Sequence, residues 1–114
     1  MADDVVLINV EEGTKRVMNN AKLYIKLITK FKADTKLDDL EGALEAGDWE
    51  KAQGAAHTIK GLSANLSFTE LFKQSLELET QIKAKAVNPD QITVVKNVFA
   101  QTLTEIDKVI AQND

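Results

Sequence analysis

Paired helix-stop and helix-start signals divide this chain into short segments, and they limit its fold more than any other feature. Gly47 is typical of the residue that ends a helix, and Asp48 is typical of the N-cap of the next one. Asn88 and Pro89 form a second strong start signal, because proline is favoured at the first helical position. Such frequent stops argue against one long coiled coil and favour several helices joined by short loops.

Apolar residues recur at helical spacing between these signals. We expect an N-terminal strap over residues 1–8, followed by a short helix that Asn9 caps and that ends near Asn19-Asn20. Longer helices are expected over 21–33, 35–46, 49–65, 68–86 and 89–112. Asp34 is the expected N-cap of the 35–46 helix.

The short loops and one-sided apolar stripes predict an all-α fold. We expect an antiparallel up-down four-helix bundle over about 34–112, with the strap and additional N-terminal helices of about 1–33 covering one end. The length suits one domain over 1–114, which can bury a single core without disulfides or metal.

Composition narrows the possible functions. The chain has no cysteine and a single histidine, which excludes thiolate catalysis, disulfide scaffolds and multi-histidine metal sites. A net charge of −4 argues against nucleic-acid binding. No apolar run is long enough for a membrane span, and the first ten residues lack the basic region of a secretory signal. We therefore expect a cytoplasmic monomer without a metal or cofactor of its own.

The single histidine, His57, lies within the 49–65 segment, and its direction follows from its neighbours. With Ile59 as the reference, the positions within roughly 60° of it on a helical wheel form an apolar stripe. These positions are Ala52, Ala55, Ala56, Leu62, Ser63 and Leu66. His57 lies at about 160° from Ile59 and therefore points away from the core.

Small residues surround His57 on the outward face. Gly54 lies one turn before it, Gly61 one turn after and Ala64 two turns after, with Lys60 at three residues' spacing. Each glycine costs on the order of 1 kcal/mol of helix stability relative to alanine. This cost indicates that something other than helix stability favours glycine at these two positions. From the residues alone, a functional histidine and an ordinary solvated one explain this pattern equally well.

An outward imidazole suits nucleophilic or carrier chemistry. A cation such as Lys60 can neutralise an anionic group carried by His57, which favours a phosphoryl group over an acyl group. The chain has no glycine-rich phosphate loop and no carboxylate cluster for magnesium, so it lacks the parts needed to take phosphate from a nucleotide unaided. If His57 is functional, these residues therefore suit carriage of a phosphoryl group supplied by another protein, and not an enzyme with its own nucleotide site.

The stretch Ala56-His57-Thr58-Ile59-Lys60-Gly61, continued to Leu66, resembles the A-H-x-[LI]-K-G-x-x-x-x-[LIV] signature of histidine-containing phosphotransfer (HPt) domains in two-component and phosphorelay signalling. The likeness extends over most of the chain, to the 21–33 helix, the Gly47-Asp48-Trp49 turn and the helix with Leu71, Ser75, Leu78 and Glu79.

The resemblance implies that His57 is phosphorylated, on Nε2, and that Lys60 steadies the phosphoryl oxygens while Gly61 leaves room for a partner. It places Glu79 where it can hydrogen-bond the imidazole and hold its tautomer. Lys83 matches a position that is often basic and is a candidate for binding phosphate; simple pairing with Glu79 one turn away explains it equally well. Weaker candidates for partner contact are Gln53, Gly54 and Ala64.

The implied partners are a response-regulator receiver domain, a sensor histidine kinase, or both, with Mg²⁺ supplied by the receiver. A helical adaptor that binds a receiver or kinase without carrying phosphate is the alternative, although adaptors of that kind usually lack the histidine. One position departs from the family: Ser67 stands where glycine is usual. If this position needs a positive φ, serine costs on the order of 1 kcal/mol there.

Overall fold

The computed structural model describes residues 6–112. Six helices lie within this range: α1 (Val10–Arg16), α2 (Ala21–Phe31), α3 (Lys36–Ala46), α4 (Trp49–Leu66), α5 (Thr69–Lys83) and α6 (Pro89–Gln112). The described residues contain no strand, which confirms the all-α prediction. None of these helices is long and apolar enough to cross a membrane.

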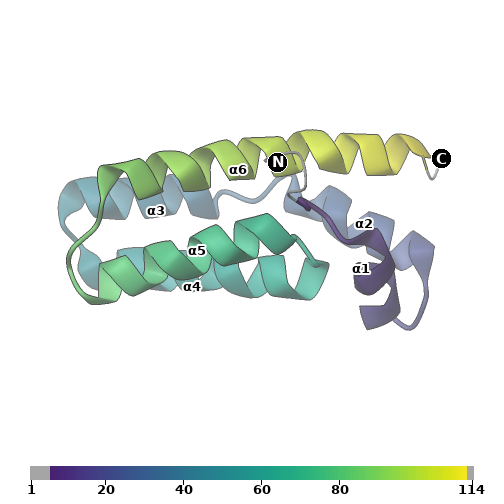
Figure 1. The fold of residues 1–114 in the computed structure, drawn as a ribbon, viewed down its shortest axis with the longest axis horizontal. Helices are drawn as coiled ribbons and strands as arrows, with labels where there is room; N and C mark the ends of the chain where they lie inside the picture. The colour runs from purple at the N-terminus through teal and green to yellow at the C-terminus, as the bar shows by residue number, and fades with distance from the viewer. Residues whose placement is uncertain (1–5, 113–114) are drawn as a thin grey trace.

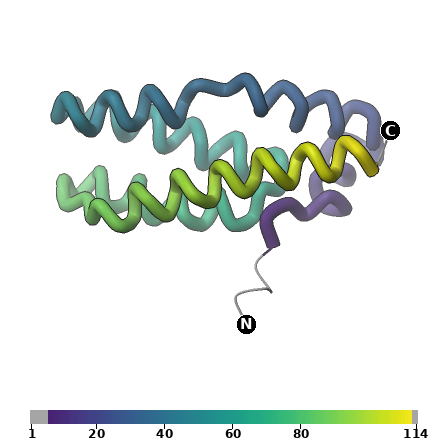
Figure 2. The backbone as a smooth tube through the Cα atoms, turned by 90° about the horizontal axis from the view of Figure 1, so that it is seen from above, coloured from purple at the N-terminus to yellow at the C-terminus, as the bar shows by residue number. Residues whose placement is uncertain are grey.

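The four helices α3 to α6 pack in sequence order, α3 on α4, α4 on α5 and α5 on α6, and each runs opposite to the one before it (Figure 1). α2 lies in line with α3, so the two together accompany α6 along its length (Figure 2). α1 packs against α2 and α4 at the end where α4 turns into α5 (Figure 1). The arrangement is compatible with the expected bundle and its N-terminal cover.

The apolar stripe of each long helix faces a shared core. Its most deeply buried side chains come from α2 to α6 and include Ile28, Leu40, Ile59, Leu71, Leu78 and Ile106. In α4 the stripe is narrow and built of small residues, and every predicted position is buried except Leu62, which is half-buried. Because these buried side chains fix which face of α4 packs on the core, the opposite face, which carries His57, points to solvent.

Helix ends confirm most of the predicted caps. Gly47 adopts φ 71 at the end of α3, and the Asp48 side chain accepts a hydrogen bond from the Lys51 amide at 3.1 Å. The prediction for Asp34 is wrong by one position, because Thr35 is the N-cap of α3. The Asp34 carboxylate still accepts a bond from the Lys36 amide at 2.7 Å, since a free amide of the first turn lies within its reach.

Several predicted helices are too long. α1 ends at Arg16, before Met18 and Asn19, which adopt φ 60. α2 ends at Phe31 and not near 33, and α5 ends at Lys83, before Lys85 with φ 53. The left-handed conformations interrupt the helical hydrogen bonds after α1 and α5. After α2 the amides of residues 32–34 instead bond to carbonyls three residues back, which ends the α-helical pattern. The predicted strap falls partly on residues 1–5, outside the described residues; Leu7 and Ile8 pack half-buried on the core.

The turn between α4 and α5 is fastened to α1. Ser67 adopts φ 60, so the position does need the left-handed conformation that glycine adopts freely. Its hydroxyl donates to Glu12 Oε1 at 2.8 Å, and its carbonyl accepts from the Asn9 amide at 2.9 Å. Next to it, the buried Tyr24 hydroxyl donates to the Leu66 carbonyl at 2.7 Å. These bonds offset the strain at Ser67.

Candidate functional site

His57 lies midway along α4, and its side chain is 67% exposed. The helix around it is bare, because a Cβ atom added to Gly54 or Gly61 would meet no other atom within 4 Å. Neither glycine is therefore required by packing inside the protein. The imidazole stands on an open face, as the helical wheel predicts.

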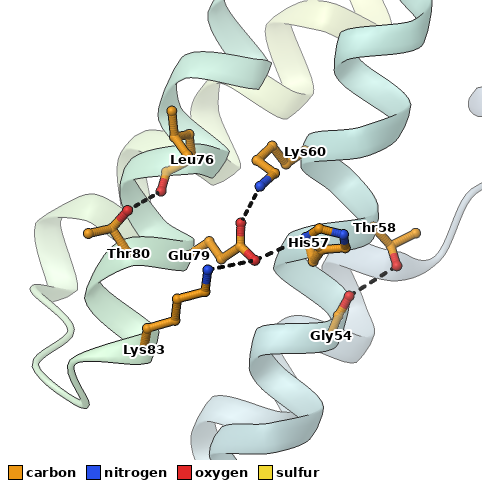
Figure 3. A network of polar contacts seen from close by, with 8 residues as sticks. All are labelled: Gly54, His57, Thr58, Lys60, Leu76, Glu79, Thr80 and Lys83. Carbon is orange, nitrogen blue, oxygen red and sulfur yellow. Dashed lines mark hydrogen bonds and ion pairs between the residues drawn. The ribbon is translucent and has the colours of Figure 1, made fainter.

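Glu79 of α5 lies beneath the imidazole. Its Oε2 is 3.1 Å from His57 Nδ1, although 22 residues separate the two in sequence (Figure 3). The Glu79 side chain is only 3% exposed, so this carboxylate is held at the α4–α5 contact. An ionised carboxylate only accepts hydrogen bonds, so the proton of a neutral imidazole resides on Nδ1. Nε2 is then left with its lone pair free.

Two lysines face the same carboxylate. Lys60 Nζ, from α4, lies 2.7 Å from Glu79 Oε1, and Lys83 Nζ, one turn along α5, lies 3.8 Å from Oε2 (Figure 3). Together with the ring, these cations occupy both oxygens of Glu79. Sequence reasoning placed Lys60 beside His57 but did not anticipate that its ammonium would sit on Glu79, because that contact depends on how α4 and α5 are aligned.

The charge state of Glu79 follows from two opposing effects. Burial removes water from the carboxylate and by itself raises the pKa of Glu79. The close contacts with Lys60 and His57, and the positive charges of Lys60 and Lys83, favour the ionised form and outweigh burial. The pKa of Glu79 therefore lies below its ordinary value, and the carboxylate is ionised at neutral pH.

A shallow hollow of about 420 Å³ lies beside the imidazole, between α4 and α5. Its lining consists of one apolar position and five polar or charged side chains: Gly54, Glu50, Gln53, His57, Glu79 and Lys83. Within residues 6–112, no three acidic or histidine side chains gather as a metal site would require. The hollow is a polar recess in front of the histidine, open to an incoming group.

The structure brings some of the predicted residues together and leaves others apart. Gln53, Gly54, Glu79 and Lys83 share the hollow with His57, whereas Gly61 and Ala64 continue the same helix face beyond it. Glu50 also lines the hollow and was missed. Its spacing of seven residues, two helical turns, before His57 was the available signal.

Comparisons with known proteins bear on the same region. Searches of curated proteins and of solved structures gave no match. A family model described as the Hpt domain matches residues 28–111, which include α3, α4, α5 and nearly all of α6. This match confirms the resemblance seen in the sequence around His57. The chain belongs to the Hpt domain family, whose members serve phosphotransfer in phosphorelay signalling.

Proposed function

We propose that His57 carries a phosphoryl group between an aspartyl phosphate of a response-regulator receiver domain and a second partner. In the forward step the Nε2 lone pair forms a bond to phosphorus. The bond between phosphorus and the aspartyl oxygen breaks, and its electron pair stays on the departing carboxylate. The reverse step returns the phosphoryl group to an aspartate, so the chain acts as a carrier.

The observation that carries this proposal is the geometry of the His57–Glu79 pair. Glu79 Oε2, at 3.1 Å from Nδ1, selects the tautomer in which the exposed Nε2 is the nucleophile. When Nε2 binds phosphorus, the ring gains positive charge and keeps its Nδ1 proton. The ionised Glu79 stabilises that charge through the same hydrogen bond, as an orienting carboxylate does for other nucleophilic histidines.

The partner supplies what this chain lacks. We expect the receiver to bring Mg²⁺ and the acidic pocket around its aspartate, and a sensor kinase to bring the nucleotide site. The docking face is expected to include His57 and apolar residues of α2. Leu23 of α2 is 40% exposed, and Leu27 lines a largely apolar hollow of about 430 Å³ between α2 and α4. α3 has no large exposed apolar side chain, so the apolar part of the docking face is assigned to α2.

A transfer assay tests the proposal. The chain is incubated with a panel of receivers carrying labelled aspartyl phosphate, and acid-labile, base-stable label on the chain is measured. The wild-type chain should take label from at least one receiver, and His57→Gln should take none while unfolding at the wild-type temperature.

Label on His57→Gln would show that another residue is the acceptor. Tight binding of a receiver without any label on the wild-type chain would favour the adaptor alternative instead.

A further inference from the structure

Three lysines form a row along the exposed face of α2, at one edge of the molecule (Figure 2). Lys22, Lys26 and Lys30 are spaced four residues apart, so each lies about one turn from the next, and all three are exposed. α2 contains no acidic residue, although the whole chain carries a net charge of −4. Within residues 6–112 this lysine row takes part in no ion pair, whereas the next lysine, Lys32, pairs with Asp107. The row is a patch of uncompensated positive charge.

The lysine row does not help α2 to fold. Like charges four residues apart repel each other across one turn of a helix. Lys22 also stands in the first turn of α2, where the helix dipole disfavours a cation. A reason outside helix stability is therefore indicated, and a ligand of negative charge would turn this repulsion into attraction.

A largely apolar groove runs beside the row, between α2 and α4. Two hollows of about 430 and 450 Å³ share the lining side chains Leu27, Leu62 and Leu66, so they adjoin along the contact of the two helices. Lys30, the last lysine of the row, lines one of them. Asp34 is the acidic residue of the two linings, and its carboxylate already accepts a backbone hydrogen bond at the start of α3. The groove thus offers an apolar floor with a cationic edge.

The walls of this α2–α4 groove restrict what can fill it. Backbone groups within α2 and α4 are bonded inside their own helices, so an extended segment would find no backbone partner there. A helix satisfies its own backbone groups and can lay an apolar face in such a groove. Leu23, one turn before Leu27, is 40% exposed and extends the apolar strip along α2. The flank of a bound helix that faces the lysine row must be acidic for the charges to match.

We propose that this surface binds an acidic amphipathic helix of the partner, with its apolar side in the α2–α4 groove and its carboxylates against Lys22, Lys26 and Lys30. The lysine row then selects among receivers by the charge of the helix that they present, and it speeds their association through long-range attraction. The inference rests on the proposed function for the identity of the partner as a receiver.

A binding test with two synthetic peptides isolates the sign of the charge. Both peptides form amphipathic helices with leucine on one face, and the opposite face carries glutamate in one peptide and lysine in the other. Binding is followed through the amide signals of the ¹⁵N-labelled chain. Lys26→Gln/Lys30→Gln removes two charges of the row. Lys73→Gln/Lys85→Gln is the matched control, because it removes two exposed lysines from α5 and the turn after it.

The glutamate peptide should shift the amide signals of Leu23 and Leu27, and the lysine peptide should not. Lys26→Gln/Lys30→Gln should bind the glutamate peptide about tenfold more weakly at low salt, with a smaller loss at high salt, and the control should bind it like the wild type. The same loss should appear in kcat/KM for transfer from a phosphorylated receiver. Equal binding of the two peptides, wild-type affinity or wild-type kcat/KM in Lys26→Gln/Lys30→Gln, or shifts confined to other helices would overturn the proposal.

An anionic surface of another kind would give a different result. If vesicles of anionic phospholipid bound the wild-type chain through α2 and the glutamate peptide did not, the lysine row would be a lipid-binding face and the proposal would be wrong. Because neither peptide carries phosphate, these outcomes do not depend on His57. Failure of the wild-type chain to take phosphate from any receiver or from phosphoramidate, a small phosphoryl donor, would instead overturn the proposed function.

Discussion

Replacing the outward glycines of α4 by alanine should change the stability of the protein and its rate of phosphoryl transfer in opposite directions. Gly54 and Gly61 are helical, neither has a positive φ, and an added Cβ meets nothing within 4 Å at either position. Each substitution should therefore recover the helix penalty of about 1 kcal/mol, which corresponds to a rise in melting temperature of about 4 °C for a domain of this size. The double variant should gain about 2 kcal/mol if the two sites act independently.

Transfer should change in the opposite direction. A methyl group at Gly54 or Gly61 lies on the face that a receiver must approach, and overpacking of a close contact typically costs about 1–3 kcal/mol. Transfer from a phosphorylated receiver should therefore slow by about tenfold or more. Loading of His57 by phosphoramidate should stay near the wild-type rate, since this small donor needs much less room.

Gly42 supplies the matched control. It lies in α3, and a Cβ added there also meets nothing within 4 Å. Gly42→Ala should give the same stabilisation in thermal unfolding and leave receiver transfer unchanged. If all three alanine variants were stabilised and all transferred phosphate at the wild-type rate, the idea that the two α4 glycines keep room for a partner would be refuted. Destabilisation by Gly54→Ala would refute the packing argument itself.

Three further predictions concern the end of the molecule where α1 meets the α4–α5 turn. Ser67→Ala should lower the free energy of unfolding by about 1 kcal/mol in chemical denaturation, because it loses the hydrogen bond to Glu12 and keeps the left-handed φ of 60. Ser67→Gly loses the same bond but relieves the backbone strain, so its free energy of unfolding should stay close to that of the wild type. Gly13→Ala should destabilise by about 1–3 kcal/mol in the same measurement, since its Cβ would lie 2.3 Å from the Tyr24 ring, and an unchanged midpoint would contradict this. Burial, followed by the charge of Glu12, raises the pKa of Tyr24 from 10.0 to about 12. The neutral phenol therefore contributes up to about 3 kcal/mol to the free energy of unfolding below pH 10, and this contribution is lost as the pH rises through 12. Tyr24→Phe should not show this loss, and equal pH profiles of stability for the two proteins would argue against the reasoning.

Local patterns in the sequence were enough to predict the helices and the direction of His57. Caps such as Asp48 and Gly47 act through hydrogen bonds and dihedral angles within a few residues, so their effect can be read along the chain. Helix ends marked by non-glycine residues at positive φ, such as Met18 and Asn19, were misplaced. Few residues other than glycine, asparagine and aspartate signal that conformation in a sequence, so Met18 gave no local sign that the helix ends before it.

The candidate site likewise combines features that local sequence determines with features that depend on tertiary packing. The outward direction of His57 and the bare helix around it follow from a period of 3.6 residues, which the sequence by itself determined. The proximity of Glu79 entered through the family resemblance, and its distance of 3.1 Å from Nδ1 depends on the register of α5 against α4. Register is decided by packing of side chains far apart in the chain, so only the tertiary structure could place Lys60 on Glu79, leave Lys83 beside the hollow and fasten Ser67 to Glu12.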